Sequence, residues 1–105
     1  MIIRITIARF PNKNKALGFG DILSTRFKLL PEAKVKIAMT CLIGEAKVVV
    51  IGVYKNNQDL EAGKKIFQEI INTIKTMDGS YEVLPGKITS FFDVDAEQQL
   101  TRYDN

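Results

Sequence analysis

The sequence predicts one α+β domain, built from a four-stranded antiparallel sheet with two helices on one of its faces. Three observations lead to this fold class. The chain has 105 residues, 46% of them hydrophobic, which suits a single domain with one core. Its apolar residues recur at every second position in some segments, as in strands, and at every third or fourth position in others, as in helices. These segments follow one another in the order β-α-β-β-α-β.

The first two segments are a strand and a helix. In "MIIRITIARF" isoleucine occupies every second position, so one face of the predicted strand is apolar. Beyond it, apolar residues recur at helical spacing, and these are Ala16, Phe19, Leu23, Phe27 and Leu30. This stripe passes through Gly18 and Gly20, which predicts that both glycines lie inside the helix. A helix that begins at Asp21, after a loop over residues 11–20, is the alternative.

The two glycines of "KNKALGFGDILSTRF", residues 13–27, are not predicted to bind a phosphate. A phosphate loop holds its glycines in non-helical backbone just before a helix, with free N–H groups aimed at the anion. Here Asp21 follows directly, and its carboxylate would repel a phosphate. The P-loop also needs Gly-Lys-Ser/Thr, and the dinucleotide fingerprint needs a third glycine three residues beyond Gly20. The sequence contains neither of these.

A long β-hairpin is predicted over "KVKIAMTCLIGEAKVVVIGVY", residues 34–54. Its first half alternates as a strand does and ends near Gly44, where "IGEA" suits a tight connection. Its second half, "KVVVIGVY", is apolar on both faces, which is typical of a central strand or of one covered on both sides.

The rest of the domain is predicted as a helix and a last strand. Residues 59–77 carry apolar side chains at helical spacing, and Gly79 supplies the stop. "YEVLPGK" is predicted as a connection with a Pro-Gly turn, and "KITSFFDV" as the fourth strand. The polar end of the chain is predicted as a short helix or a frayed end. The chain is thus one domain over residues 1–95 with a polar C-terminal tail over residues 96–105.

One face of the sheet is expected to be apolar and to contact the helices. Six residues are expected there: Ile3, Ile5, Ile7, Val35, Ile37 and Met39. The other face is expected to mix polar and apolar side chains, together with some valines of the third strand. These are Arg4, Thr6, Lys36, Ala38, Thr40, Leu42, Tyr54 and either Thr89 or Phe91. This mixture is too apolar to remain in water and too polar for a closed core.

The order of elements is the ferredoxin-like, or split βαβ, pattern. With its length, the hairpin "KVKIAMTCLIGEAKVVVIGVY" and a closing strand followed by a short tail, most of the chain resembles the dimeric α+β barrels, which include the antibiotic-biosynthesis monooxygenases. The resemblance implies a homodimer in which two sheets pair face to face. Members with oxygenase activity, and related haem-degrading proteins, rely on combinations of Asn, Trp, Tyr and His. This chain has no His and no Trp, so no catalytic residue is carried over to it.

The side chains present exclude several kinds of chemistry. Without histidine, a Ser-His or Cys-His nucleophile cannot form, and the single cysteine, Cys41, cannot complete a zinc site. We therefore predict no cofactor and no haem or transition-metal binding. The run "DVDAE" places Asp93, Asp95 and Glu97 at alternate positions but lacks the glycine and the distal glutamate of an EF-hand loop. It is interpreted as a solvated, acidic strand end.

No part of the sequence is predicted to enter a membrane. No apolar run approaches the roughly 18 to 20 residues of a membrane-spanning helix. Arg4 and Arg9 interrupt the segment where a signal peptide would be continuously apolar. The sequence therefore predicts a cytoplasmic location.

A candidate ligand site follows from strand alternation. The residues placed on one face of neighbouring strands are Arg4, Thr6, Lys36 and Tyr54. Two cations beneath a dimer interface need a counter-ion, because burying an unpaired charge is costly. The sequence therefore predicts a small, partly apolar anionic ligand. An internal ion pair with an acid such as Asp93 or Glu45 is the alternative.

Two other functions remain open at the level of sequence. One is a cofactor-independent, oxygenase-like enzyme. The other is an RNA-binding module of the same fold, which stacks bases on aromatic residues of its central strands. "KVVVIGVY" lacks the aromatic pattern of that module, whereas Tyr54 and the basic Arg4 and Lys36 are compatible with it.

Overall fold

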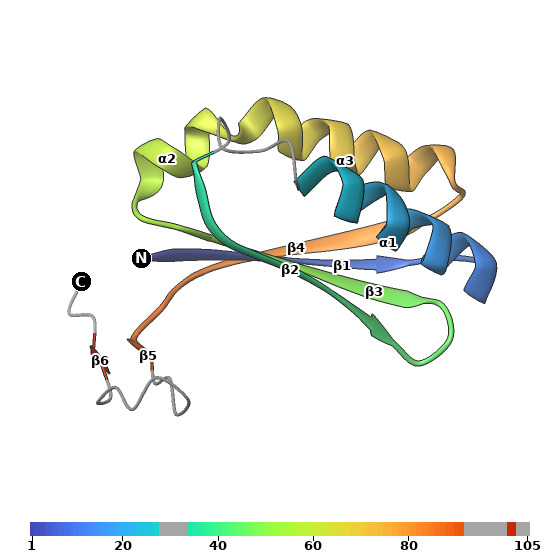
Figure 1. Cartoon of the computed structure of the whole chain (residues 1–105), viewed down its shortest axis with the longest axis horizontal. Coiled ribbons are helices and arrows are strands. Elements are labelled where there is room, and N and C mark those ends of the chain that lie inside the picture. Colours follow the sequence, from blue (N-terminus) through green and yellow to red (C-terminus); the bar gives the residue numbers. More distant parts are fainter. Residues whose placement is uncertain (28–33, 92–100, 103–105) are drawn as a thin grey trace.

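The computed structural model describes residues 1–27, 34–91 and 101–102. Its elements, in chain order, are β1 (Ile2–Arg9), α1 (Lys13–Phe27), β2 (Val35–Ile43), β3 (Lys47–Tyr54), α2 (Asn57–Ala62), α3 (Lys64–Thr76), β4 (Ser80–Lys87), β5 (Ser90–Phe91) and β6 (Thr101–Arg102). Strands β1 to β4 form one antiparallel sheet in the order β2-β3-β1-β4. The helices α1, α2 and α3 lie on one face of this sheet (Figure 1). The predicted α+β, ferredoxin-like fold is confirmed.

Helix α1 runs through Gly18 and Gly20, as the apolar stripe predicts. The alternative of a loop over residues 11–20 is wrong. Asn12 caps the helix, because its Oδ1 accepts a hydrogen bond from the backbone N–H of Lys15 at 2.9 Å. Three members of the stripe are buried, namely Ala16, Phe19 and Leu23. The two glycines are helix residues, so they do not form a phosphate loop.

The helix predicted over residues 59–77 is two helices, α2 and α3, which meet at Gly63. The Asn56 side chain caps α2 by accepting the N–H of Asp59 at 2.9 Å. The buried residues of α3 are Ile70, Ile71 and Ile74. Within the described residues, no helix is long and apolar enough to cross a membrane.

The fourth strand lies earlier in the chain than predicted. β4 is the segment "SYEVLPGK", which pairs with β1 along its whole length. The predicted connection over residues 81–87 is therefore wrong. Pro85 is compatible with a strand here because β4 is at the edge of the sheet, where a missing N–H need not break a bond to a neighbour.

The end of the chain also differs from the prediction. Of the strand predicted over residues 87–94, the described part contains the two-residue strand β5, which pairs with β6. The tail, predicted as a short helix or a frayed end, contributes β6 at Thr101–Arg102. The acidic residues Asp93, Asp95 and Glu97 lie outside the described residues.

The hairpin of β2 and β3 is confirmed. The two strands pair antiparallel from Val35↔Tyr54 to Ile43↔Lys47. Gly44 in the connection has a φ of 63°, a left-handed conformation that glycine adopts without strain. A β-bulge between Val35 and Ile37 shifts the alternation of β2 by one residue at Lys36.

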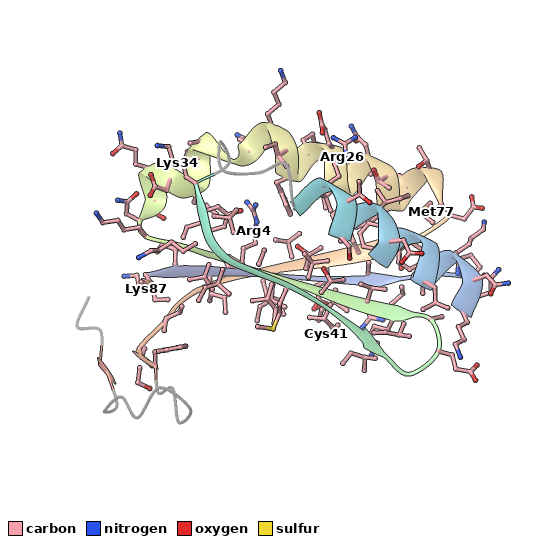
Figure 2. The ribbon with its side chains drawn as sticks, viewed as in Figure 1. Arg4, Arg26, Lys34, Cys41, Met77 and Lys87 are labelled. Carbon is pink, nitrogen blue, oxygen red and sulfur yellow. The ribbon has the colours of Figure 1, made fainter. Side chains whose placement is uncertain are left out.

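The two faces of the sheet are the reverse of those predicted. The face that the helices leave uncovered, termed the open face, carries Ile3, Ile5, Ile37, Met39, Ile51 and Val53. The helix-covered face carries smaller or polar residues, among them Arg4, Thr6, Ala8, Ala38, Val50 and Gly52. Figure 2 shows Arg4 extending toward the helices and Cys41 on the opposite side of the sheet. Of the residues predicted to contact the helices, Val35 does lie on their side, because the bulge restores it there.

The reversal has a cause in side-chain volume. The helices bring large residues to the sheet, and the largest fully buried side chains include Phe19, Leu23 and Ile74. Helices can approach a sheet closely only where the opposing residues are small, because protein interiors are packed to nearly constant density. Ala8 and Val48, which pair across β1 and β3, are almost fully buried beneath these side chains.

Gly79 lies between α3 and β4, where no larger residue fits. A Cβ at this position would lie 2.8 Å from Cγ2 of Ile74 and 3.0 Å from Cε1 of Phe10. Because Ile74 is fully buried and cannot move aside, we expect Gly79→Ala to lower the free energy of unfolding by about 1–3 kcal/mol in urea denaturation. Gly20→Ala is the matched control, since a Cβ there meets nothing within 4 Å and alanine favours a helix. Equal stability of the two variants would contradict this packing.

Candidate functional site

A small cavity lies between the sheet and α3, on the helix-covered face. Its volume is about 30 Å³, which is room for about two water-sized groups, and it is partly open to solvent. Strands β1, β2 and β3 and helix α3 supply its walls. The residues that define its chemistry are Arg4, Thr6, Ala38, Gly52, Tyr54 and Phe67. We term it the Arg4 cavity.

Small residues make room for the Arg4 cavity. Ala38 of β2, Gly52 of β3 and Arg4 of β1 are paired in one row across the sheet. The ring of Tyr54 lies close over Gly52, because a Cβ at Gly52 would be 3.2 Å from the ring atom Cε2. Any side chain at position 52 would therefore press on Tyr54, and the absence of one lets the ring reach Arg4.

Arg4 is held between two aromatic rings. One of its terminal N–H groups donates a hydrogen bond of 2.8 Å to the hydroxyl of Tyr54. Its Cζ lies 3.6 Å from the centre of the Phe67 ring and 5.3 Å from the centre of the Tyr54 ring. Burial lowers the pKa of Arg4, while the nearby Tyr54 and Glu61 act in the opposite direction. A guanidinium keeps its proton in proteins, so Arg4 is a half-buried cation.

Tyr54 is buried, with 4% of its surface exposed. Burial raises the pKa of its hydroxyl, and Arg4 opposes this rise. Tyr54 is therefore a neutral phenol at physiological pH. Because its oxygen accepts the hydrogen bond from Arg4, its own hydrogen is left to donate to another group.

The arrangement can bind a negative charge. A guanidinium has five N–H donors in its plane, and the Phe67 ring, 3.6 Å from Cζ, is a cation–π contact that uses none of them as a hydrogen-bond donor. One donor is engaged by Tyr54. The two ion pairs recorded among the described residues, Lys15–Asp78 and Arg26–Glu69, do not involve Arg4. Within this part of the chain, four donors of Arg4 remain for a ligand.

The structure brings together three of the four predicted site residues. Arg4, Thr6 and Tyr54 line the Arg4 cavity, although on the helix-covered face rather than the face predicted for them. Lys36 does not line it, because the bulge in β2 leaves this residue exposed. Glu45, an alternative partner for Arg4, lies in the hairpin connection beside Arg9 and Lys47. Asp93, the other alternative, lies outside the described residues.

Sequence reasoning missed Phe67 and Gly52. Phe67 is one of the apolar residues of the helix predicted over residues 59–77, and only the packing of α3 on the sheet places it over Arg4. A glycine within the β-branched run "KVVVIGVY" is a signal that could have been used, since glycine inside a strand often marks close approach of another group.

A larger hollow of about 370 Å³ lies on the open face. It is apolar, and its walls come from β1, β2, β3 and the segment that includes Ile88 and Phe91. Three of these residues are substantially exposed: Ile37 at 42%, Met39 at 46% and Phe91 at 43%. Apolar surfaces of this kind are typical of contacts with other molecules. The central strands present aliphatic residues here, which does not favour the stacking of RNA bases.

The described residues contain no group of three Asp, Glu, Cys or His side chains that could hold a metal ion. The prediction that the protein binds no metal, haem or other cofactor stays a prediction.

Comparison with known proteins identifies the fold. No protein-family model and no curated protein matches the sequence. A solved structure of a proposed antibiotic biosynthesis monooxygenase from Deinococcus radiodurans superposes with a TM-score of 0.74 at 8% identity, over 89% of this chain and 97% of that one. A dimeric ferredoxin-like protein from an uncultured marine organism superposes with a TM-score of 0.70 at 11% identity, over 88% of this chain and 90% of that one. The chain therefore has the ferredoxin-like fold of these two proteins.

Proposed function

We propose that this protein is a homodimer that pairs the open faces of two sheets, and that each subunit binds a small, partly apolar anion in the Arg4 cavity. The observation that carries the binding function is the guanidinium of Arg4. It is half-buried, stacked on Phe67, and engages one neighbouring hydroxyl among the described residues. Glu61 is near enough to raise the pKa of Arg4, but no ion pair joins the two among the described residues, so a bound anion would give this half-buried cation a direct counter-charge.

The open face supports the dimer. Its residues are aliphatic, and several are exposed in the single chain although β-branched and long apolar side chains are normally buried. A solved protein of the same fold, at a TM-score of 0.70, is described as dimeric. A second copy of the chain would remove these side chains from water.

The walls of the Arg4 cavity support an anion with an apolar part. Beside Arg4, Thr6 and Tyr54, its lining is made of apolar side chains and glycine, such as Val50 and Ile70. A purely polar anion would leave these walls without a partner, whereas a neutral apolar ligand would leave Arg4 without one.

Thermal unfolding in the presence of a panel of anions tests the binding function. We expect the melting temperature to rise with the concentration of a bound carboxylate, because a ligand that binds only the folded state stabilises it. Arg4→Ala should abolish this rise. Arg9→Ala, the same substitution at an exposed position of the same strand, should retain it. No rise with any anion, or a rise that Arg4→Ala retains, would contradict the proposed site.

A further inference from the structure

We propose that the ligand of the Arg4 cavity is a short-chain monocarboxylate, held by its carboxylate group between the guanidinium of Arg4 and the hydroxyl of Tyr54. This rests on the proposed function and narrows the anion to one chemical class. Three features of the cavity lead to it: the planar arrangement of the donors, the preference of these donors for a planar anion, and the apolar walls.

The donors match a planar group with two oxygens. The N–H groups of a guanidinium lie in one plane and pair edge to edge with both oxygens of a carboxylate. The Phe67 ring centre lies 3.6 Å from Cζ of Arg4, and a guanidinium that packs face-on against an aromatic ring keeps its N–H edge for an anion. The hydroxyl of Tyr54 accepts from Arg4 and adds its own hydrogen as a further donor.

The Arg4 cavity suits a planar anion better than a tetrahedral one. A volume of about 30 Å³ holds about two water-sized groups, which corresponds to the two oxygens of a carboxylate. Sulfate and phosphate have four oxygens in a tetrahedron, so at most two of these oxygens can lie in the plane of the guanidinium donors. They would also bring up to two negative charges to a lining in which Arg4 is the charged residue.

The apolar walls of the Arg4 cavity favour an alkyl chain as the part of the ligand beyond its carboxylate. Val50 and Ile70 are apolar and suit a short alkyl chain, whereas a second carboxylate against them would be buried without a partner. Ala38 lines the cavity on the edge strand β2 and is itself exposed, so it lies at the mouth. The Arg4 cavity is partly open to solvent at this mouth, so an alkyl chain of roughly two to four carbon atoms would extend from the donors out through it.

Titration of the full-length, ¹⁵N-labelled protein, followed by NMR, tests the proposal. The probes are acetate, propionate and butyrate, compared with sulfate, phosphate and succinate at equal ionic strength. We expect the amide signals of Gly52 and Ala38 to shift and saturate with the monocarboxylates, with a Kd of about a millimolar for ligands of this size. The other three anions should bind at least about tenfold more weakly, because a buried, unpaired charge costs more than one tenfold step.

Three variants separate the parts of the site. Tyr54→Phe removes one donor and should weaken acetate binding about five- to tenfold, as expected for one hydrogen bond. Arg4→Lys keeps the charge but loses the planar pair of donors, and should weaken it by at least about tenfold. Ala38→Val keeps both donors but fills the mouth, so it should weaken butyrate more than acetate. Arg9→Lys is the control and should change none of these affinities.

The results of these titrations show whether the monocarboxylate proposal fails alone or together with the proposed anion site. If sulfate, phosphate or succinate binds more tightly than the monocarboxylates, and Arg4→Lys removes that binding, the monocarboxylate class is wrong and the anion site stands. If no anion shifts the signals of Gly52 and Ala38, both are wrong. If acetate binds Tyr54→Phe and Arg4→Lys as tightly as the unaltered protein, its site lies elsewhere and the proposal is wrong.

Discussion

The Met39→Glu variant is expected to have the mass of a single chain, 11.8 kDa, under conditions in which the unaltered protein has twice that mass. Met39 lies on the open face, where it pairs with Ile51 of the neighbouring strand and is 46% exposed in the single chain. In the proposed dimer this position is buried against the second sheet. An unpaired carboxylate there would cost several kcal/mol, which is enough to separate the subunits. Light scattering at micromolar protein concentration measures the mass directly.

Leu42→Glu is the matched control for this experiment. Leu42 belongs to the same strand and is similarly exposed, at 42%, but it lies on the helix-covered face beside Ala16 and Gly20 of α1. The same charge at this position should leave the dimer intact. If Leu42→Glu separates the subunits and Met39→Glu does not, the interface is not on the open face and the proposed dimer is wrong. A single-chain mass for the unaltered protein would contradict the dimer itself.

The largest loss of stability is expected for Phe19→Ala. The Phe19 side chain is fully buried and packs against Phe10, with 5.0 Å between ring centres and 41° between ring planes. Truncation leaves a cavity between α1 and the sheet, and we expect it to lower the free energy of unfolding by about 3–5 kcal/mol. Urea denaturation measures this, at one fixed protein concentration because the stability of a dimer depends on concentration.

Leu17→Ala controls for the change in helix composition. Leu17 lies on the same helix but is 45% exposed, so its truncation should cost less than about 1 kcal/mol. A loss for Phe19→Ala no larger than that for Leu17→Ala would contradict the packing of α1 on the sheet.

The type and order of most elements could be predicted from the sequence, because periodicity records which positions of a segment share a face. The stripe of α1 persisted through two glycines, and its helix is present. The direction of each face could not be predicted in this way. The expectation that the more apolar face contacts the helices is wrong here, because the isoleucines of β1 lie on the open face.

Two local signals were misleading. The Pro-Gly pair at positions 85 and 86 is typical of a turn, but at a sheet edge the strand β4 tolerates it. Alternation placed Lys36 beside Arg4, whereas the bulge after Val35 interrupts the alternation without any residue that marks it.

That Arg4, Thr6 and Tyr54 lie together could be predicted from the sequence. Arg4, Thr6 and Tyr54 share a face by strand alternation, and this remains true whichever face the helices cover. The stacking of Phe67 on Arg4 could not be predicted, since it depends on how α3 is positioned over the sheet.

The central place of β1 in the sheet determines the order in which the chain can fold as it is synthesised. β1 is made first, yet one of its two neighbours is β4, so that Ile2 pairs with Lys87. The hairpin of β2 and β3 can form early and accept β1, but the other edge of β1 stays unpaired until β4 has left the ribosome. An unpaired edge beside exposed isoleucines readily pairs with other chains. The nascent protein is therefore most prone to aggregation between the synthesis of β3 and that of β4.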